Sequence, residues 1–359
     1  MNTRTPRLEI YPDRIRDNAR SIIKLCKSHG AQVAVVTKVA SAHAAVTNAV
    51  LEAGPDMLAD SRIMNLRYLG DSGVSVPRLL LRLPTPSEAH DVVLSSELSL
   101  NSSAQTMKKL SDAAVALGRT HTVIVMVDVG DLREGVWPEK APELVAQAAR
   151  LPGIEVAGIG CNLACYGGVI PSEQNMATLI AVRDACRKKS GLSLNLISGG
   201  NSSSLPLLAS GKMPKEINHF RLGESILLGR NVIDRSPWPG TRQDTFRLVA
   251  EVIEVEHKPS VPIGETGQDA FGGTPQYVDR GIRKRAICNI GRQDVVVDGI
   301  EPEDAGIIVL GGSSDHLILD VEEAASEVKV GDQIAFYPGY GALLALSTSP
   351  YVAKVVVKA

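Results

Sequence analysis

Five charged or amide side chains stand where a short apolar run ends and a loop begins. They are Lys38, Arg133, Asn162, Asn201 and Arg221. Lys38 directly follows the aliphatic run 33–37, so its amine is expected beside an apolar floor. Desolvation there lowers the pKa of a lysine and prepares its amine for nucleophilic chemistry. A surface lysine that merely ends a strand is the alternative interpretation of this feature alone.

Arg133 lies in the segment Asp128–Gly135, which holds two glycines and four charged residues. The forked guanidinium of an arginine in such a loop suits a carboxylate ligand. An internal ion pair with Asp128 or Asp131 is the alternative. The segment therefore indicates either a substrate-carboxylate site or a structural ion pair.

The segment Ser198–Ser204 combines two glycines with Asn201 and hydroxyl side chains, Ser202 among them. Glycines let the backbone approach a ligand, and donors at the start of a helix favour an anion such as phosphate. Capping of a helix without any ligand is the alternative. Arg221 and Gly223 follow the next apolar run, and the Gly223 amide is a further donor to phosphate. A lysine amine, a phosphate cradle and an arginine at one rim indicate a pyridoxal phosphate site.

Eight short aliphatic runs alternate with segments of helical period in the first two thirds of the chain. The expected strands are Val33–Thr37, Met57–Ala59, Arg78–Leu83, Leu98–Leu100, Thr122–Val127, Val156–Gly160, Leu194–Ser198 and Phe220–Leu222. Helical segments between them include 13–29, 63–69 and 141–151. This alternation predicts an α/β fold with an N-terminal (β/α)8 TIM-like barrel, whose polar strand ends meet at one rim.

Residues 234–240 contain prolines and a glycine, which break helices and strands. After this segment the alternation of strand and helix patterns gives way to short strand patterns. We therefore expect the barrel to span residues 1–235 and a C-terminal, mainly-β domain to span 236–359. Strands of this domain are expected at 248–256, 286–290, 295–297, 307–310, 317–321 and 351–357. The N-terminal segment Leu8–Tyr11 is a candidate to join the same domain.

The composition argues against several other classes of protein. The chain has 359 residues, with 38 basic and 40 acidic side chains, and no basic block of the kind that binds nucleic acid. The first residues lack a secretory apolar segment and no run is long enough to span a bilayer, so we expect a cytoplasmic protein without a membrane partner. The five cysteines have no metal-type spacing, so we expect no metal site, and Cys161 and Cys165 are interpreted as packed thiols.

These segments together resemble the alanine racemase family, in which a pyridoxal phosphate barrel is joined to a C-terminal β-domain. Val35–Lys38 resembles the segment with the cofactor lysine, and Asp128–Gly135 resembles the family's Asp-Thr-Gly-Met-x-Arg-x-Gly. The segment 158–164 matches the family's Thr-His-Phe-Ala, so Asn162 stands where a histidine packs against the cofactor ring. In the β-domain, 311–321 resembles Gly-Arg-Val-Cys-Met-Asp-Gln.

The resemblance implies a role for each matching residue. Lys38 would hold pyridoxal phosphate, Arg221 would face its pyridine nitrogen, and Arg133 would lie on the substrate side. The phosphate would be bound by the pair Asn201 and Ser202 together with the amides of Gly223 and Ser225. Ser314 would approach the substrate carboxylate across a subunit boundary, which implies a homodimer with a shared active site.

The sequence also departs from the family pattern. The family's second catalytic base is a tyrosine in a Val-Ser-Tyr-Gly turn, and the matching turn here has Ile263, which cannot move a proton. Another group must serve, and the candidates by chemistry are Cys288, Asp294, Asp269, Glu265, His43 and Tyr166. Of these, Cys288 and Asp294 are our leading candidates, and the choice between them is open.

With these departures the sequence resembles the ornithine racemase group of predicted amino acid racemases. Its marks Val-Asp-x-Gly-Asp-Leu-Arg-Glu-Gly, Gly-Gly-Asn-Ser-Ser-Ser and Pro-Ile-Gly-Glu are all present. The resemblance implies racemisation of ornithine or a related basic amino acid, with Asp269 as one carboxylate that could accept the distal ammonium. The alternatives are an alanine or serine racemase, a lyase on the same scaffold, and a protein that binds the cofactor without catalysis.

Overall fold

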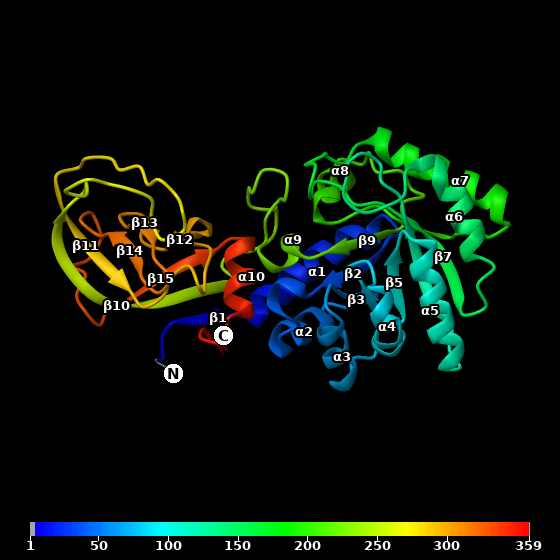
Figure 1. Cartoon of the computed structure of the whole chain (residues 1–359), viewed down its shortest axis with the longest axis horizontal. Helices are drawn as coiled ribbons and strands as arrows, with labels where there is room; N and C mark the ends of the chain where they lie inside the picture. The colour runs from blue at the N-terminus through cyan, green and yellow to red at the C-terminus, as the bar shows by residue number, and fades with distance from the viewer. Residues whose placement is uncertain (1–3, 359) are drawn as a thin grey trace. The chain divides into compact units, whose positions relative to one another are not determined.

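The computed structural model describes residues 4–358 and divides the chain into two compact units (Figure 1). One unit is Asp13–Gln243, and the other combines the N-terminal segment that ends at Pro12 with the segment that begins at Asp244. The expected division after Arg235 thus differs from the observed one by eight residues. The breaker segment belongs to the first unit because Trp238 donates its amide to the Gly229 carbonyl (2.8 Å) and the Asn18 side chain donates to the Arg242 carbonyl (2.8 Å).

Eight parallel strands form a closed barrel in the first unit, as the sequence predicted. They are β2 (Gln32–Val36), β3 (Met57–Asp60), β4 (Arg78–Leu80), β5 (Leu98–Asn101), β6 (His121–Met126), β7 (Ile154–Gly160), β8 (Leu196–Ser198) and β9 (His219–Leu222). The barrel closes between β2 and β9, with Val33 opposite Phe220. Its apolar core takes alternate residues from the strands, such as Ala34 and Val36 on β2. This alternation is the period of two that directs side chains to one face of a strand.

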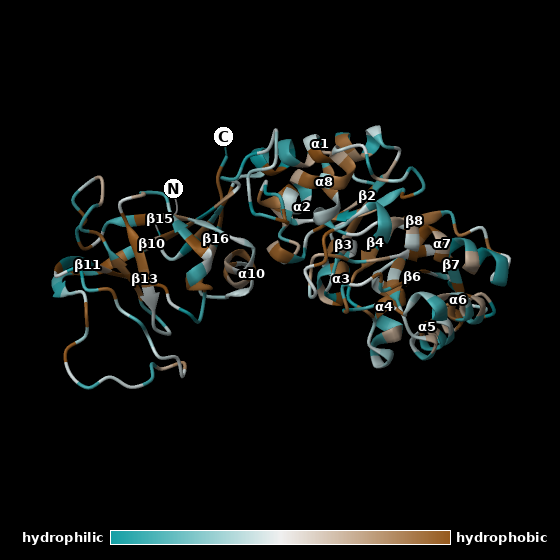
Figure 2. Cartoon of the chain, turned by 90° about the horizontal axis from the view of Figure 1, so that it is seen from above, coloured by the Kyte–Doolittle hydropathy of each residue, from teal (hydrophilic) through white to brown (hydrophobic). Residues whose placement is uncertain are grey.

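Among the described residues of the first unit, one helix precedes the first barrel strand, seven alternate with the strands, and one follows the last strand. They are α1 (Pro12–Ser28), α2 (Ala44–Leu51), α3 (Ile63–Asp71), α4 (Ala89–Ser95), α5 (Ala104–Ala116), α6 (Ala141–Ala148), α7 (Glu173–Ser190), α8 (Leu205–Ala209) and α9 (Glu224–Leu227). Helix α1 buries residues three to four positions apart and carries both apolar and hydrophilic colour along its length (Figure 2). Helix α7 begins at a capping box formed by Ser172 and Asn175 and ends at Gly191, whose φ of 75° suits glycine.

Two buried histidines make the barrel sensitive to acid. Burial lowers the pKa of His121 to about 4, and burial together with the positive charge of Arg221 lowers the pKa of His219 to about 3. Histidine in the unfolded chain binds a proton near pH 6.5, so acid favours the unfolded state. We expect the free energy of unfolding to fall by about 2 kcal/mol for His121 alone between pH 7 and pH 5.

Denaturant titrations at pH 7, 6 and 5 measure this loss. The variant His121→Gln is expected to reduce the slope of stability against pH, and His90→Gln, at an exposed position on α4, is the matched control. A slope that is the same in His121→Gln as in the wild type would contradict the expectation.

The second unit holds the predicted β-domain. Its strands are β1 (Arg7–Ile10), β10 (Phe246–Pro259), β11 (Ile282–Cys288), β12 (Ile300–Pro302), β13 (Ile308–Gly312), β14 (Leu317–Asp320), β15 (Gln333–Pro338) and β16 (Ala353–Val356). The sheet order is β12-β15-β10-β11-β14-β13. The N-terminal strand β1 pairs antiparallel with β10 and parallel with β16.

In the described part of this unit one expected strand does not form, and two strands and one helix were not expected. No strand forms at 295–297, because the amides of Asp294 and Val295 both donate to the Gly291 carbonyl and close a turn. Strands β12 and β15 were not expected. Neither was helix α10 (Tyr340–Thr348), which buries Ala342, Leu343 and Leu346. These elements are short and are flanked by glycine and proline residues, so they leave no clear periodic pattern in the sequence.

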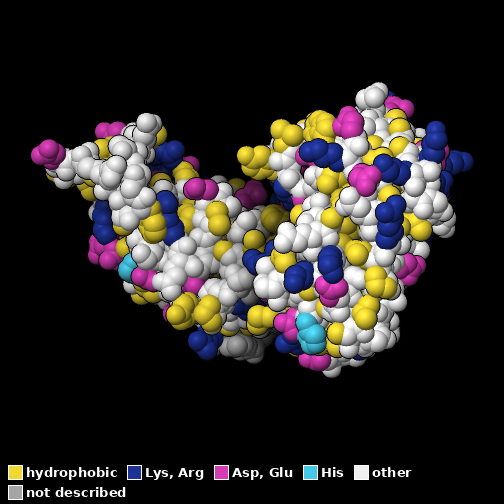
Figure 3. Space-filling model, turned by 45° about the vertical axis from the view of Figure 1, so that its right-hand side comes forward, with side chains coloured by type: hydrophobic (Ala, Val, Ile, Leu, Met, Phe, Trp, Pro, Cys, Tyr) yellow, Lys and Arg dark blue, Asp and Glu magenta, His cyan; other side chains and the backbone are white. Residues whose placement is uncertain are grey.

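The surface carries charges of both signs. On the face shown in Figure 3, basic and acidic side chains are interspersed, as the formal net charge of −2 leads one to expect. Within residues 4–358, no helix has the length and apolarity needed to cross a membrane.

Candidate active site

The barrel brings the five polar side chains of the sequence analysis to one rim. Lys38 follows β2 and begins a 3-10 turn, Arg133 lies on the loop after β6, and Asn162 follows β7. Asn201 follows β8, and Arg221 lies near the end of β9. Because all eight strands are parallel, their carboxyl ends share one face of the barrel, the face at which such barrels hold ligands.

The Lys38 amine lies in a largely desolvated environment. Burial lowers its pKa, and the charged groups that also act on it are Cys165, Arg133, Asp60 and Glu134, in that order. Asp60 is itself fully buried, and burial raises the pKa of its carboxyl group. That carboxyl group accepts hydrogen bonds from the Thr37 hydroxyl (2.9 Å) and the Asn65 amide (3.0 Å), so it anchors the turn that carries Lys38. A lysine with a lowered pKa is a competent base and nucleophile near neutral pH.

Arg221 is buried inside the barrel, and burial lowers its pKa. Its guanidinium donates to the Cys161 carbonyl (2.7 Å), to Oδ1 of Asn162 (3.4 Å) and to the Ser198 hydroxyl. The Ser198 hydroxyl also contacts Nδ1 of His219 at 2.7 Å. Arg221 is therefore held in one orientation by side chains and backbone from two neighbouring strand ends, those of β7 and β8.

The segment after β8 both caps a turn and presents donors. Oδ1 of Asn201 accepts from the Ser203 amide (2.7 Å), and its Nδ2 donates to the Leu163 carbonyl (2.8 Å). The Ser202 hydroxyl accepts from the amides of Gly223 (3.2 Å) and Ser225 (3.4 Å). The capping interpretation therefore describes Asn201 well, while Ser202, Gly223 and Ser225 gather three donor groups at one point.

The residues at this rim fit pyridoxal phosphate. Nδ2 of Asn162 is buried and has no hydrogen-bond partner among the described residues, although Oδ1 of the same amide accepts from Asn201 and Arg221. A buried donor without a partner is costly, so an acceptor on a bound group would satisfy it. A Cβ atom at Gly223 would lie 3.1 Å from Cβ of Val36, which explains why this tight approach uses glycine. The amine, the clustered donors and the buried guanidinium match an aldehyde, a phosphate and a pyridine ring respectively.

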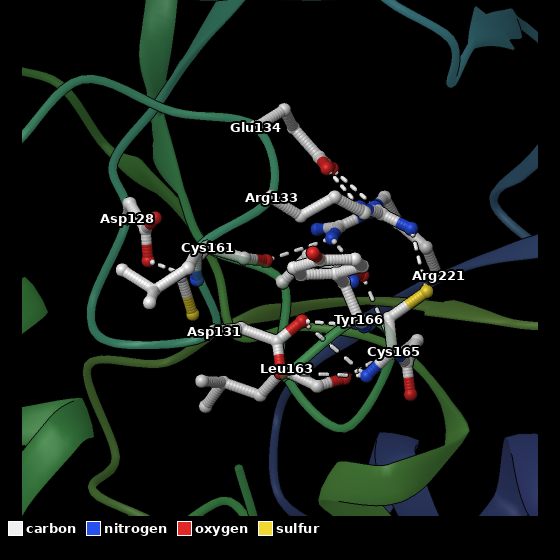
Figure 4. A network of polar contacts seen from close by, with 12 residues as sticks. Asp128, Asp131, Arg133, Glu134, Cys161, Leu163, Cys165, Tyr166 and Arg221 are labelled. Carbon is white, nitrogen blue, oxygen red and sulfur yellow. Dashed lines mark hydrogen bonds and ion pairs between the residues drawn. The ribbon is translucent and has the colours of Figure 1, made fainter. Parts of the chain in front are cut away.

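The loop after β6 is fixed by its two aspartates. Asp128 accepts from the amides of Gly130 (2.8 Å) and Leu132 (3.2 Å). Buried Asp131 accepts from the amides of Tyr166 (3.0 Å), Val169 (3.2 Å) and Cys165 (3.3 Å), and so ties this loop to the loop after β7 (Figure 4). Both aspartates are thus occupied by backbone donors rather than by Arg133.

Arg133 forms its ion pair with Glu134, not with Asp128 or Asp131 as the alternative interpretation held. Its Nε and Nη2 donate to the Glu134 carboxylate, and its Nη1 donates to Sγ of Cys165 at 2.7 Å. The contact between Arg133 and Cys165 joins residues 32 positions apart. Figure 4 shows the Glu134 carboxylate and the Cys165 sulfur on different sides of the Arg133 guanidinium.

The Asp131 carboxylate is expected to hold the loop after β7 in place. Asp131→Asn keeps the size of the side chain but replaces one acceptor oxygen by an amino group that faces backbone N–H donors. We expect the free energy of unfolding to fall by about 2 kcal/mol, a typical value for lost hydrogen bonds to a charged group. We also expect faster amide exchange at Cys165, Tyr166 and Val169, measured by hydrogen–deuterium exchange.

Asp184→Asn on the exposed side of α7 is the matched control and is expected to change neither quantity. Unchanged protection of the three amides in Asp131→Asn would contradict this role.

Four of the predicted site residues lie in the second unit. Cys288 is fully buried and burial raises the pKa of its thiol to about 12, and buried Asp294 accepts from the Ser349 hydroxyl (2.6 Å). These surroundings disfavour both residues as groups that exchange protons with a substrate. Asp269 accepts from the amides of Phe271 (2.9 Å) and Gly273 (2.8 Å), which lower its pKa, and Ser314 is exposed.

Two further residues at the barrel rim, Glu134 and Cys165, were not predicted as site residues from the sequence. Cys161 is a packed thiol as expected, fully buried with its pKa raised to about 12. Cys165 is instead exposed and contacts Arg133, so the same interpretation was wrong for it. Glu134 was counted only as a charge in a loop. The available signal was position, because Cys165 follows Asn162 by three residues and lies on the same rim.

The chain is similar in sequence to known amino acid racemases. The alanine racemase N-terminal domain family matches residues 10–231. The chain is 44% identical to an ornithine racemase from Acetoanaerobium sticklandii over 350 residues, which cover 97% of this chain and 99% of that protein. It is 41% identical to a lysine racemase from Thermotoga maritima, with 98% of each chain covered.

Solved structures show the same fold. The alanine racemase of a D-cycloserine-producing Streptomyces lavendulae superposes with a TM-score of 0.76 at 19% identity, covering 100% of this chain and 98% of that one. A D-threonine aldolase from Filomicrobium marinum superposes with a TM-score of 0.72 at 17% identity, covering 96% and 89%. At these identities the likeness shows the fold alone.

Proposed function

The chain belongs to the alanine racemase family and is a pyridoxal phosphate-dependent amino acid racemase, and we propose that its substrate is ornithine. The observation that carries the substrate is the 44% identity to an ornithine racemase along nearly the whole of both chains. Lysine is the second candidate, because the relative at 41% identity is a lysine racemase. The two amino acids differ by one methylene group between the α-carbon and the distal ammonium.

We propose that the cofactor is held by the residues gathered at the barrel rim, namely Lys38, Asn162, Asn201, Ser202, Arg221, Gly223 and Ser225. When bound through its aldehyde, pyridoxal phosphate withdraws electrons from the substrate α-carbon and makes the α-proton removable. The Lys38 amine, with its lowered pKa, then serves as the base on one face of that carbon. Arg221 supplies a fixed buried positive charge that its three hydrogen-bond partners keep in place.

We propose that the substrate is bound by Arg133, Ser314 and Asp269. The Arg133 guanidinium lies at the rim with its charge partly balanced by Glu134, and it would take the α-carboxylate. The Asp269 carboxyl group stays ionised because its backbone donors lower its pKa, so it could accept a distal ammonium. Ser314 and Asp269 belong to the second unit, and we propose a cytoplasmic homodimer in which this unit of one subunit completes the site of the other.

Proton exchange and stereochemistry measured together test the function. The cofactor-loaded protein is incubated in D2O with L-ornithine, L-lysine, L-arginine, L-alanine or L-serine, and the α-position is followed by NMR while the enantiomers are separated by chiral chromatography. Deuterium incorporation with formation of the D-isomer from ornithine is the expected result. Turnover of lysine alone would select the second candidate. Turnover of alanine or serine would overturn a basic substrate, and exchange with none would overturn the racemase.

A further inference from the structure

We propose that Cys165 is the group that exchanges a proton with the substrate α-carbon on the face opposite to Lys38. This inference rests on the proposed racemase function. A racemase must remove a proton on one face and return one on the other, and Ile263 stands where the family has its second base. The barrel rim holds an exposed thiol that neither the sequence analysis nor the cofactor residues account for.

The backbone around Cys165 is built to hold its side chain in a defined place. Its amide donates to Asp131, and the amide of the next residue, Tyr166, donates to the same carboxylate (3.0 Å). The preceding residue, Ala164, has a φ of 48°, a conformation that L-residues rarely adopt. Gly167 lies so close that a Cβ atom would be 2.6 Å from the Asp131 carbonyl oxygen. Such strained backbone persists only where surrounding contacts enforce it.

The charges around the sulfur suit proton transfer. Nη1 of Arg133 donates to Sγ at 2.7 Å, and Cys165 has the largest electrostatic effect of any side chain on the Lys38 amine. The thiol therefore lies near two cationic side chains at the rim that would hold the substrate. A thiol in an electropositive, accessible site can give up and take back a proton.

The other acidic groups that act on Lys38 are already engaged in hydrogen bonds or an ion pair. Asp60 is buried and accepts hydrogen bonds from Thr37, Asn65 and the Arg62 amide. Glu134 is paired with Arg133 through both of its oxygens. Arg133 itself is a poor acid or base because arginine stays protonated in proteins. Of the acidic groups that act on Lys38 in the described residues, only Cys165 is exposed, with Arg133 as its hydrogen-bond donor.

The step balances without any redox change. In one direction the α-carbon–hydrogen bond breaks, the proton forms an S–H bond on Cys165, and the electron pair stays with the substrate. The ammonium form of Lys38 then gives a proton to the opposite face of the same carbon. In the reverse direction Lys38 takes the proton and the Cys165 thiol supplies one.

Enantiomer-resolved exchange in D2O tests the assignment in the cofactor-loaded protein. In Cys165→Ser, interconversion of ornithine is expected to fall at least about 100-fold, the usual contribution of an acid–base group. The same variant is expected to keep α-deuterium exchange from one enantiomer, because Lys38 still acts on its own face. Cys186→Ala, which alters a buried cysteine on α7, is the matched control and is expected to keep both rates within about twofold.

Alkylation gives a readout that does not depend on turnover. In the cofactor-free protein, iodoacetamide is expected to modify Cys165 ahead of the four buried cysteines, as located by peptide mass spectrometry. Arg133→Gln is expected to slow that modification, because it removes the cation beside the sulfur. An unchanged rate in Arg133→Gln, or modification of another cysteine first, would overturn the electrostatic part of the argument.

The outcomes separate this inference from the function on which it rests. An inactive wild-type protein would overturn both. An active wild type with Cys165→Ser racemising within about threefold of it would overturn only the role of Cys165. Loss of exchange from both enantiomers in a folded, cofactor-loaded Cys165→Ser would also overturn it, since a structural role would then suffice. Loss confined to Tyr166→Phe would transfer the role to the neighbouring hydroxyl.

Discussion

Replacing Lys38 by alanine is expected to reduce the rate of racemisation by roughly 10⁴-fold or more, the scale seen when a group that both binds and catalyses is lost. The amine has a lowered pKa, and the turn that carries it is anchored through Thr37 and Asp60. No other lysine among the described residues comes within two positions after the end of a barrel strand, so we expect none to substitute for it. The rate is measured by chiral chromatography, and cofactor retention by visible absorbance after gel filtration.

Two variants control for trivial explanations of that loss. Lys24→Ala removes an exposed lysine from α1 and is expected to leave both rate and absorbance unchanged. Lys38→Arg keeps a positive charge but cannot form the covalent link, so it is expected to be as inactive as Lys38→Ala. Visible absorbance and activity that persist in Lys38→Ala would end the assignment of the cofactor to this residue.

Replacing Arg221 by leucine is expected to have the second-largest effect, and it acts on stability and reaction outcome together. The change leaves the Cys161 carbonyl, Oδ1 of Asn162 and the Ser198 hydroxyl without their buried donor. We expect a loss of about 3 kcal/mol in the free energy of unfolding, because three buried acceptors lose hydrogen bonds from a charged donor. Denaturant titration of the cofactor-free protein measures it.

The reaction outcome of Arg221→Leu is expected to shift toward transamination. In the proposed site Arg221 would face the pyridine nitrogen, where its charge would disfavour protonation of the ring and limit electron withdrawal; leucine would remove that control. We expect a 2-oxo acid product to accumulate with the variant and not with the wild type, as detected by liquid chromatography. Arg221→Lys, which keeps the buried charge, is expected to destabilise less. A stable Arg221→Leu protein with unchanged products would contradict both parts.

The barrel and its cofactor rim could be predicted from the sequence because both are local properties. Each of the eight aliphatic runs forms one strand, and β2 and β9 close the barrel where the pattern begins and ends. A parallel barrel places every strand's carboxyl end on the same face, whatever the details of packing. The polar residue after each run is therefore assigned to that face once the runs are recognised, which is why Lys38, Asn201 and Arg221 were found together.

The tertiary structure alone decided which of these groups touch. Arg133 is surrounded by three acidic residues in sequence, yet it pairs with Glu134 because backbone amides already occupy Asp128 and Asp131. The sulfur of Cys165 meets Arg133 across 32 residues because both loops bend through left-handed backbone at Leu132 and Ala164. Such conformations are imposed by packing between loops and leave no periodic trace in the chain. The order of apolar runs and polar residues along the chain thus defines the face of the barrel and the kinds of side chain on it, whereas packing between loops brings the Cys165 sulfur to Arg133.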